Sequence, residues 1–141
     1  MRVRDGMSES VLSVGPDHTL RDAARLMSGR RVGAAVVLDP DQQGPGILTE
    51  RDILRSLGEG QDPDAEQVSD HLTSRLTHAA ADWPLERAAE EMVRGQFRHV
   101  VVVDGAEPVG ILSMRDIVRC WTEAGATSEV PPGPGVPAAG A

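Results

Sequence analysis

The sequence predicts a mixed α/β (α+β) fold in which one β-α-β-β-α unit occurs twice along the chain. The first observation is an internal repeat: the shift that places Val3 on Val68 also aligns identical residues as far as Asp39 and Asp104. The second observation is a helical spacing of apolar residues in each copy. The third is a pair of short apolar runs, rich in valine and isoleucine, that each end at a turn signal.

Each unit is expected to open with an extended segment, at residues 11–14 in the first copy and 76–79 in the second. A helix should follow, because apolar residues recur at the i, i+3, i+4, i+7 positions of one helical face. In the first copy these are Leu20, Ala23, Ala24 and Met27, and in the second they are Leu85, Ala88, Ala89 and Met92.

The sequence also predicts where this helix begins and ends in each copy. Thr19 and Asp22 have the spacing of a capping box, which predicts a helix start in the first copy. Pro84 suits the first helical turn of the second copy, because its missing N–H is not needed there. Gly29 and Gly95 are expected to stop the two helices.

A hairpin and a second helix complete each unit. The strands are expected at 34–38 and 46–48 in the first copy and at 100–103 and 110–112 in the second, joined by Asp-, Pro- and Gly-containing turns. The final helices should run from Asp52 and from Asp116. The units therefore occupy residues 3–58 and 68–122, joined by a polar linker at 59–67 and followed by a Pro/Gly/Ala-rich tail at 123–141 that is expected to be disordered.

Composition excludes several classes of function. The formal net charge of −8 disfavours a nucleic-acid binder, and no apolar run is long enough to cross a membrane. The lone cysteine, Cys120, allows no disulfide within the chain and fits a reducing cytoplasm. The histidines lack metal-ligand spacing and no catalytic motif is present, so we expect neither an enzyme nor a metal site nor a catalytic cofactor.

The chemistry concentrates in a duplicated signature, G-I-L-[Thr/Ser]-x-R-D-I. A hydroxyl and an arginine at the start of a helix suit a phosphate, and a carboxylate beside them could hold two ribose hydroxyls. The same Thr/Ser-to-Asp spacing also reads as a helix capping box, and this alternative stays open. The candidate ligand-binding residues are Thr49, Arg51 and Asp52 in the first copy and Ser113, Arg115 and Asp116 in the second.

The two copies differ just before their central strands. Arg98 and His99 stand there in the second copy and could reach a phosphate, although solvated residues at a strand entry explain them equally well. The first copy has Gly33 and Ala34 at these positions, and such small residues could let an adenine lie against backbone. The two clefts of the molecule are therefore not expected to be equivalent.

The repeat and its signature resemble the CBS (cystathionine-β-synthase-type) domain family. The resemblance is carried by Gly46-Ile47-Leu48-Thr49-x-x-Asp52, by Gly110-Ile111-Leu112-Ser113-x-x-Asp116, by the opening Asp17-x-Thr19-Leu20 and by the stretch 98–104. It extends to stand-alone bacterial CBS proteins of the hypoxic response protein type.

The resemblance implies that the two CBS units pack into one Bateman module with two clefts between them. In many members such clefts hold AMP, ADP, ATP, S-adenosylmethionine or NAD. It further implies that Thr49, Asp52, Ser113 and Asp116 contact ribose or phosphate, that Arg51, Arg98, His99 and Arg115 lie on the phosphate side, and that Val11, Ala34 and Ala35 line an adenine pocket. A homodimer formed through the helices and a separate regulated protein are the implied partners.

Two functions therefore compete. The first is a non-catalytic regulatory sensor that binds an adenosine-containing ligand, and the second is a ligand-free dimeric scaffold or interaction protein. An enzyme is the weakest alternative, because the motifs supply no nucleophile, general base and oxyanion donor together.

Overall fold

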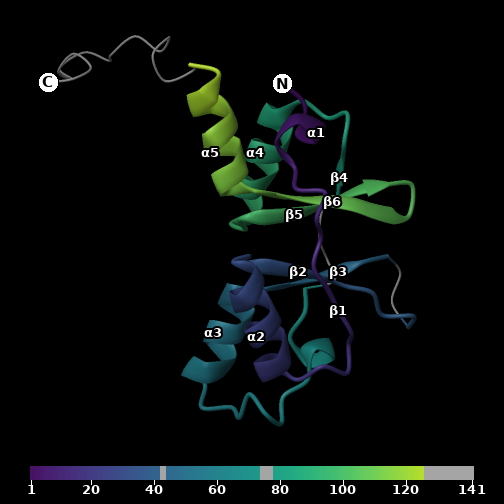
Figure 1. The fold of residues 1–141 in the computed structure, drawn as a ribbon, viewed down its shortest axis with the longest axis vertical. Coiled ribbons are helices and arrows are strands. Elements are labelled where there is room, and N and C mark those ends of the chain that lie inside the picture. The colour runs from purple at the N-terminus through teal and green to yellow at the C-terminus, as the bar shows by residue number, and fades with distance from the viewer. Residues whose placement is uncertain (42–43, 74–77, 126–141) are drawn as a thin grey trace, which may run out of the picture.

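The computed structural model of the 141-residue chain describes residues 1–41, 44–73 and 78–125, and it contains two stacked units of sheet and helix (Figure 1). The first unit comprises β1 (Ser13–Val14), α2 (Leu20–Arg30), β2 (Ala34–Val37), β3 (Gly46–Thr49) and α3 (Glu50–Gly58). The second comprises β4 (Ala79–Ala80), α4 (Leu85–Gly95), β5 (His99–Asp104), β6 (Glu107–Ser113) and α5 (Met114–Glu123). The predicted β-α-β-β-α order is confirmed in both units.

Each unit has a three-stranded sheet with the same topology. β1 pairs parallel to β2, and β2 pairs antiparallel to β3, with Ala35 opposite Leu48. β4 and β5 repeat the parallel pair, and β5 and β6 repeat the antiparallel one, with Val100 opposite Leu112. The helices cover the outer face of each sheet, and the inner faces meet at the middle of the molecule (Figure 1).

The first helix of each unit begins near its predicted start. The hydroxyl of Thr19 accepts from the N–H of Asp22 at 3.1 Å, so the predicted capping box is present. Pro84 occupies the N-cap of α4 rather than its first helical position. Part of the predicted extended segment at 76–79 lies outside the described residues, and so does the tail from residue 126 onward.

The prediction that Gly29 stops the first helix is wrong. α2 runs to Arg30, and the residue that takes the left-handed backbone is Arg31, with φ 57°. Its N–H bonds the carbonyls of Met27 and Ser28, which closes the last turn without a glycine. In the second unit the helix does end at Gly95, and Gln96 takes the same left-handed conformation, with φ 58°.

The second helices start two residues earlier than predicted, at Glu50 and Met114 instead of Asp52 and Asp116. Thr49 and Ser113 are the N-caps of these helices, which makes each aspartate the third helical residue. The aspartates therefore lie inside the first turn.

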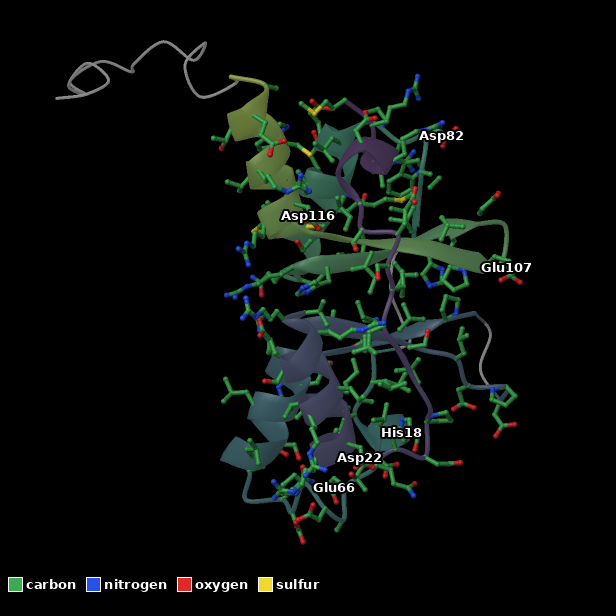
Figure 2. The ribbon with its side chains drawn as sticks, in the orientation of Figure 1. His18, Asp22, Glu66, Asp82, Glu107 and Asp116 are labelled. Atoms are coloured by element: carbon green, nitrogen blue, oxygen red, sulfur yellow. The ribbon has the colours of Figure 1, made fainter. Side chains whose placement is uncertain are left out.

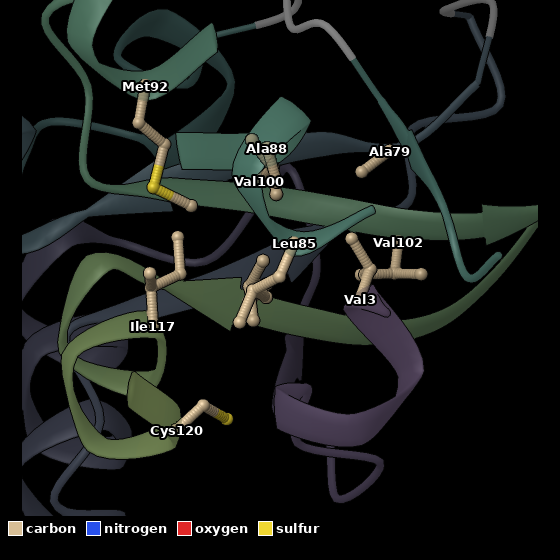
Figure 3. Packing of buried hydrophobic residues seen from close by; sticks show 10 residues of the cluster. Val3, Ala79, Leu85, Ala88, Met92, Val100, Val102, Ile117 and Cys120 are labelled. Carbon is tan, nitrogen blue, oxygen red and sulfur yellow. The ribbon is translucent and has the colours of Figure 1, made fainter. Parts of the chain in front are cut away.

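A short helix that was not expected from the sequence, α1 (Val3–Gly6), precedes the first unit in the chain but packs on the second unit. Val3 is fully buried in the core of the second unit with Leu85 and Val102 (Figure 3), and its N–H bonds the carbonyl of Trp83. Conversely η1 (Val68–Asp70) packs on the first unit, where Val68 joins the core around Leu20. Each unit thus completes the core of the other.

A third apolar cluster joins the two sheets. Val36 and Ile47 from the first unit pack against Val101 from the second, all of them buried. Val11 lies against this cluster, so the segment between α1 and β1 passes close to the junction of the units. Within the described residues, no helix has the length and apolar character needed to cross a membrane.

Candidate functional site

A large cleft, with a volume of about 930 Å³, opens between the two units. Its walls come from α2 and the start of β2 in the first unit and from β6 and the start of α5 in the second. Asp116 lies at the start of α5, on the side that faces the first unit (Figure 2). Most of the predicted site residues line this large cleft, namely Val11, Ala34, Arg98, His99, Ser113, Arg115 and Asp116.

The other predicted residues do not line the large cleft. Ala35 is fully buried in the core of the first unit, so it offers no surface to an adenine. Arg51 lines a separate small hollow of about 360 Å³ with Phe97 and Arg98. Thr49 and Asp52 line neither cavity. Ser113, Arg115 and Asp116 of the second copy thus line the large cleft, whereas Thr49, Arg51 and Asp52 of the first copy do not. Two other residues of the first signature, Glu50 and Ile53, do line it.

Both signatures form helix caps, as the alternative interpretation predicted. The backbone N–H and the hydroxyl of Ser113 each donate to Oδ2 of Asp116 at 2.8 Å. Thr49 donates in the same way to Oδ2 of Asp52, at 2.8 and 3.0 Å. The second carboxylate oxygen of Asp116 has a longer contact, 3.4 Å to the guanidinium of Arg119. A capped Asp116 therefore still presents Oδ1 beside the large cleft.

The start of each second helix has fewer backbone N–H groups available to a phosphate than the sequence suggests. The N–H of Met114 already donates to the carbonyl of Arg98 at 2.8 Å, and that of Asp116 donates to the hydroxyl of Ser113 at 3.0 Å. The N–H of Glu50 is likewise bonded, to the carbonyl of Gly33 at 2.9 Å. The N–H groups of Met114 and Asp116 are therefore not available to an anion in the large cleft, whereas the side chains of Arg98 and Arg115 line it.

The wall of the first unit is shaped by small residues. Gly33 and Ala34 line the large cleft, and a Cβ at Gly33 would lie 3.1 Å from a carboxylate oxygen of Glu50. In the second unit the repeat places Arg98 and His99 at these positions, next to Phe97. The small hollow beside Phe97 has less than half the volume of the large cleft, which is the inequality that the sequence predicted.

Arg31, Glu50 and Met27 are among the residues of the large cleft that sequence reasoning missed. The helical spacing predicts that Met27 faces the core. It is buried there, and it also lines part of the large cleft. Nothing in the sequence of the first copy alone marks Arg31 or Glu50 as a residue of a binding site. The unlike pair Arg31 and Gln96 at equivalent repeat positions would have marked the first of them.

His99 lies half-buried in the large cleft, and burial lowers its pKa from the ordinary value of 6.5. The carboxylates of Glu50 and Asp116 oppose this shift, and the neighbouring Arg98 adds to it. The imidazole is therefore neutral at neutral pH, and it can act as a hydrogen-bond donor or acceptor there.

This shift predicts a loss of stability in acid. Because the folded chain resists protonation of His99 more than the unfolded chain does, stability is full above pH 6.5 and falls as the pH drops through 6.5 toward the lowered folded-state pKa. Urea unfolding between neutral pH and about pH 5 should show a shallower pH dependence for His99→Gln than for the original chain. Identical pH profiles for the two proteins would contradict the assignment.

Among the described residues no group of three or more His, Cys, Asp or Glu side chains could hold a metal ion. Cys120 is buried against α1, where a Cβ at Gly6 would meet its sulfur at 2.8 Å. The thiol thus has a packing role and does not line the large cleft.

Comparison with known proteins places this geometry in context. The family model described as CBS domain matches residues 3–59 and again residues 68–123. The CBS domain-containing protein YhcV of Bacillus subtilis is 36% identical over 118 residues, which cover 82% of this chain and 81% of that protein. The CBS domain-containing protein CBSCBSPB3 of Arabidopsis thaliana is 34% identical over 114 residues and 80% of this chain, but the chain spans only 20% of that protein's length.

Solved structures share the fold across both units. A CBS domain protein from Pyrobaculum aerophilum, complexed with AMP, is 32% identical with a TM-score of 0.77, covering 90% of this chain and 99% of that one. A CBS-domain containing protein from Agrobacterium tumefaciens is 31% identical with a TM-score of 0.76, covering 85% of this chain and 98% of that one. The likeness therefore includes the way the two units stack.

Proposed function

The chain belongs to the CBS domain family, and from this premise we propose that it is a regulatory module that binds an adenosine-containing ligand in its large cleft. The observation that carries the proposal is the convergence of predicted residues from both units on one cavity of nucleotide size. The proposal assigns the chain no catalytic step. Its output is a change in the activity of a separate protein that the sequence does not identify.

The walls of the large cleft suggest how the ligand lies. An adenine would rest against Val11 and Ala34, where small apolar side chains leave room beside the backbone. The ribose hydroxyls would donate to Oδ1 of Asp116, since its Oδ2 is occupied by the cap. The phosphates would meet Arg98 and Arg115, because both side chains line the cleft and the N–H groups of Met114 and Asp116 already have acceptors. The AMP complex of the 32% identical relative supports this ligand class.

Isothermal titration of the chain with AMP, ADP, ATP, S-adenosylmethionine and NADH tests the proposal. We expect saturable heat for at least one of them, with a stoichiometry near one ligand per chain, because the second cavity is small and lined by Phe97 and Arg98. If no compound gives heat or a thermal shift at millimolar concentration, the proposal fails. The remaining candidate would then be the ligand-free scaffold, which the complete capping boxes of both signatures favour.

We also propose that the chain forms a homodimer through α3 and α5. Leu54 and Val118 stand at equivalent repeat positions on these helices, and their exposed fractions are 70% and 56%. Leu57 extends the same exposed face on α3. An apolar face repeated on both units suits a twofold contact with a second copy.

Replacing Leu54 by glutamate is expected to convert the dimer to a monomer, because it places a charge in an apolar contact. Sedimentation velocity on Leu54→Glu and on the original chain measures this directly. Leu38→Glu is the matched control, since Leu38 is similarly exposed but follows β2 in a loop. A monomeric original chain, or an unchanged dimer in Leu54→Glu, would refute the proposed interface.

A further inference from the structure

We infer that the large cleft selects a nucleotide with two or more phosphates over AMP and over a cationic adenosyl compound such as S-adenosylmethionine. This inference rests on the proposed function and narrows its ligand class. It follows from the charges that line the cleft, from the absence of partners for three of its arginines, and from the bonded N–H groups of Met114 and Asp116.

The charge of the large cleft opposes the charge of the chain. Four arginines and two carboxylates line it, which gives a local excess of two positive charges in a chain of net charge −8. The only histidine of the cleft, His99, is neutral at neutral pH because burial lowers its pKa. A local field of this sign attracts anionic ligands and repels cationic ones.

Three of the four arginines that line the cleft have side chains without an ion-pair or hydrogen-bond partner among the described residues. Within the described part of the chain, the guanidinium groups of Arg31, Arg98 and Arg115 form no ion pair or hydrogen bond. Arg119 differs, because it contacts Asp116 at 3.4 Å and the carbonyl of Gly6 at 3.2 Å. Free guanidinium groups on both sides of one cavity suit phosphate oxygens, which they bind in a bidentate manner.

The positions of these arginines imply more than one phosphate. Arg115 lies in the first turn of α5, one residue before Asp116, so a phosphate next to the ribose falls within its reach. Arg31 lies across the cavity, at the end of α2 in the other unit. Arg115 alone can serve a single phosphate, whereas a chain of phosphates can also engage Arg31 and Arg98. The backbone N–H groups of Met114 and Asp116 are bonded, so these two groups do not add to the selectivity.

The repeat supplies a matched substitution for the test. Gln96 occupies the position equivalent to Arg31 and holds the same left-handed backbone, with φ 58° against 57°. Arg31→Gln therefore removes the charge with a residue that this backbone position accepts. Arg30→Gln is the control, because Arg30 is the exposed last residue of α2 and does not line the cleft.

The experiment is isothermal titration of ATP, ADP, AMP and S-adenosylmethionine at low salt with a chelator present. We expect ATP to bind about tenfold or more tightly than AMP, and S-adenosylmethionine to bind most weakly. Arg31→Gln should reduce the ATP-to-AMP ratio by about tenfold with little change for AMP, and Arg30→Gln should leave the ratio unchanged. Raising the salt should also reduce this ratio.

The outcomes separate this inference from the proposed function. If AMP or S-adenosylmethionine binds as tightly as ATP, the cleft binds adenosyl ligands but the inference about phosphates is wrong. If Arg31→Gln weakens all ligands equally, Arg31 does not read the phosphates, and the inference is again wrong. If no ligand binds, the proposed function and the inference fail together.

Discussion

Replacing Asp116 by alanine is expected to weaken nucleotide binding by about 100-fold, whereas the same replacement at Asp52 should change affinity by less than about twofold. The difference arises because Asp116 lines the large cleft and keeps Oδ1 for the ribose diol, while Asp52 is nearly buried and lines neither cavity. Two hydrogen bonds to a charged group are enough to account for a change of this size. Titration calorimetry with the best-bound nucleotide measures both variants.

The two aspartates make a matched pair because they have the same structural role. Each accepts from the backbone N–H and the hydroxyl of its own N-cap residue, Thr49 or Ser113. Both alanine variants should therefore lose about 1 kcal/mol of folding stability, which urea unfolding would record. Equal losses of affinity in the two variants would show that Asp116 acts only as a cap, and the ribose assignment would then be wrong.

Leu85→Ala is expected to lower the free energy of unfolding by about 2–5 kcal/mol. Leu85 is fully buried in the second unit, among Val3, Met92 and Ile117, so its truncation leaves a cavity that several elements share (Figure 3). Leu54→Ala is the matched control and should change stability by less than about 0.5 kcal/mol in the monomer, because its side chain is 70% exposed. Urea titration followed by circular dichroism compares them.

A single cooperative transition is part of this expectation. Because Val3 and Val68 each pack in the core of the opposite unit, damage at Leu85 should destabilise the first unit as well. Two separate transitions in Leu85→Ala, with only one of them shifted, would show that the units unfold independently. Equal effects of the two leucine variants would contradict the packing assigned to Leu85.

The sequence was sufficient to predict the repeat unit because its signals are local. The Thr19 cap and the apolar spacing of Leu20, Ala23 and Met27 are set by contacts within one helix. The end of α2 was mispredicted since Arg31 takes a backbone conformation that glycine usually supplies. The packing of α1 on the second unit depends on contacts between residues far apart in the sequence. The spacing of apolar residues along the chain does not reveal such contacts.

The site was only partly predictable for a related reason. The two signatures are nearly identical in sequence, so nothing in Thr49, Arg51 or Asp52 indicates that they lie away from the large cleft. Their surroundings depend on the opposite unit. Phe97 lines the small hollow beside Arg51, whereas the equivalent residue of the first unit, Val32, lines the large cleft. The prediction that the two clefts differ came from comparing Arg98 with Gly33 across the copies, and the two cavities do differ in volume.

The segment between α1 and β1 links the large cleft to both units. Its beginning is held by the second unit, where Ser8 pairs with Ile111, and its end enters the sheet of the first unit as β1. Between these points Ser10 and Val11 line the large cleft. A ligand there would contact a segment whose two ends are held by different units. A bound ligand would therefore contact both units and also the segment that joins them.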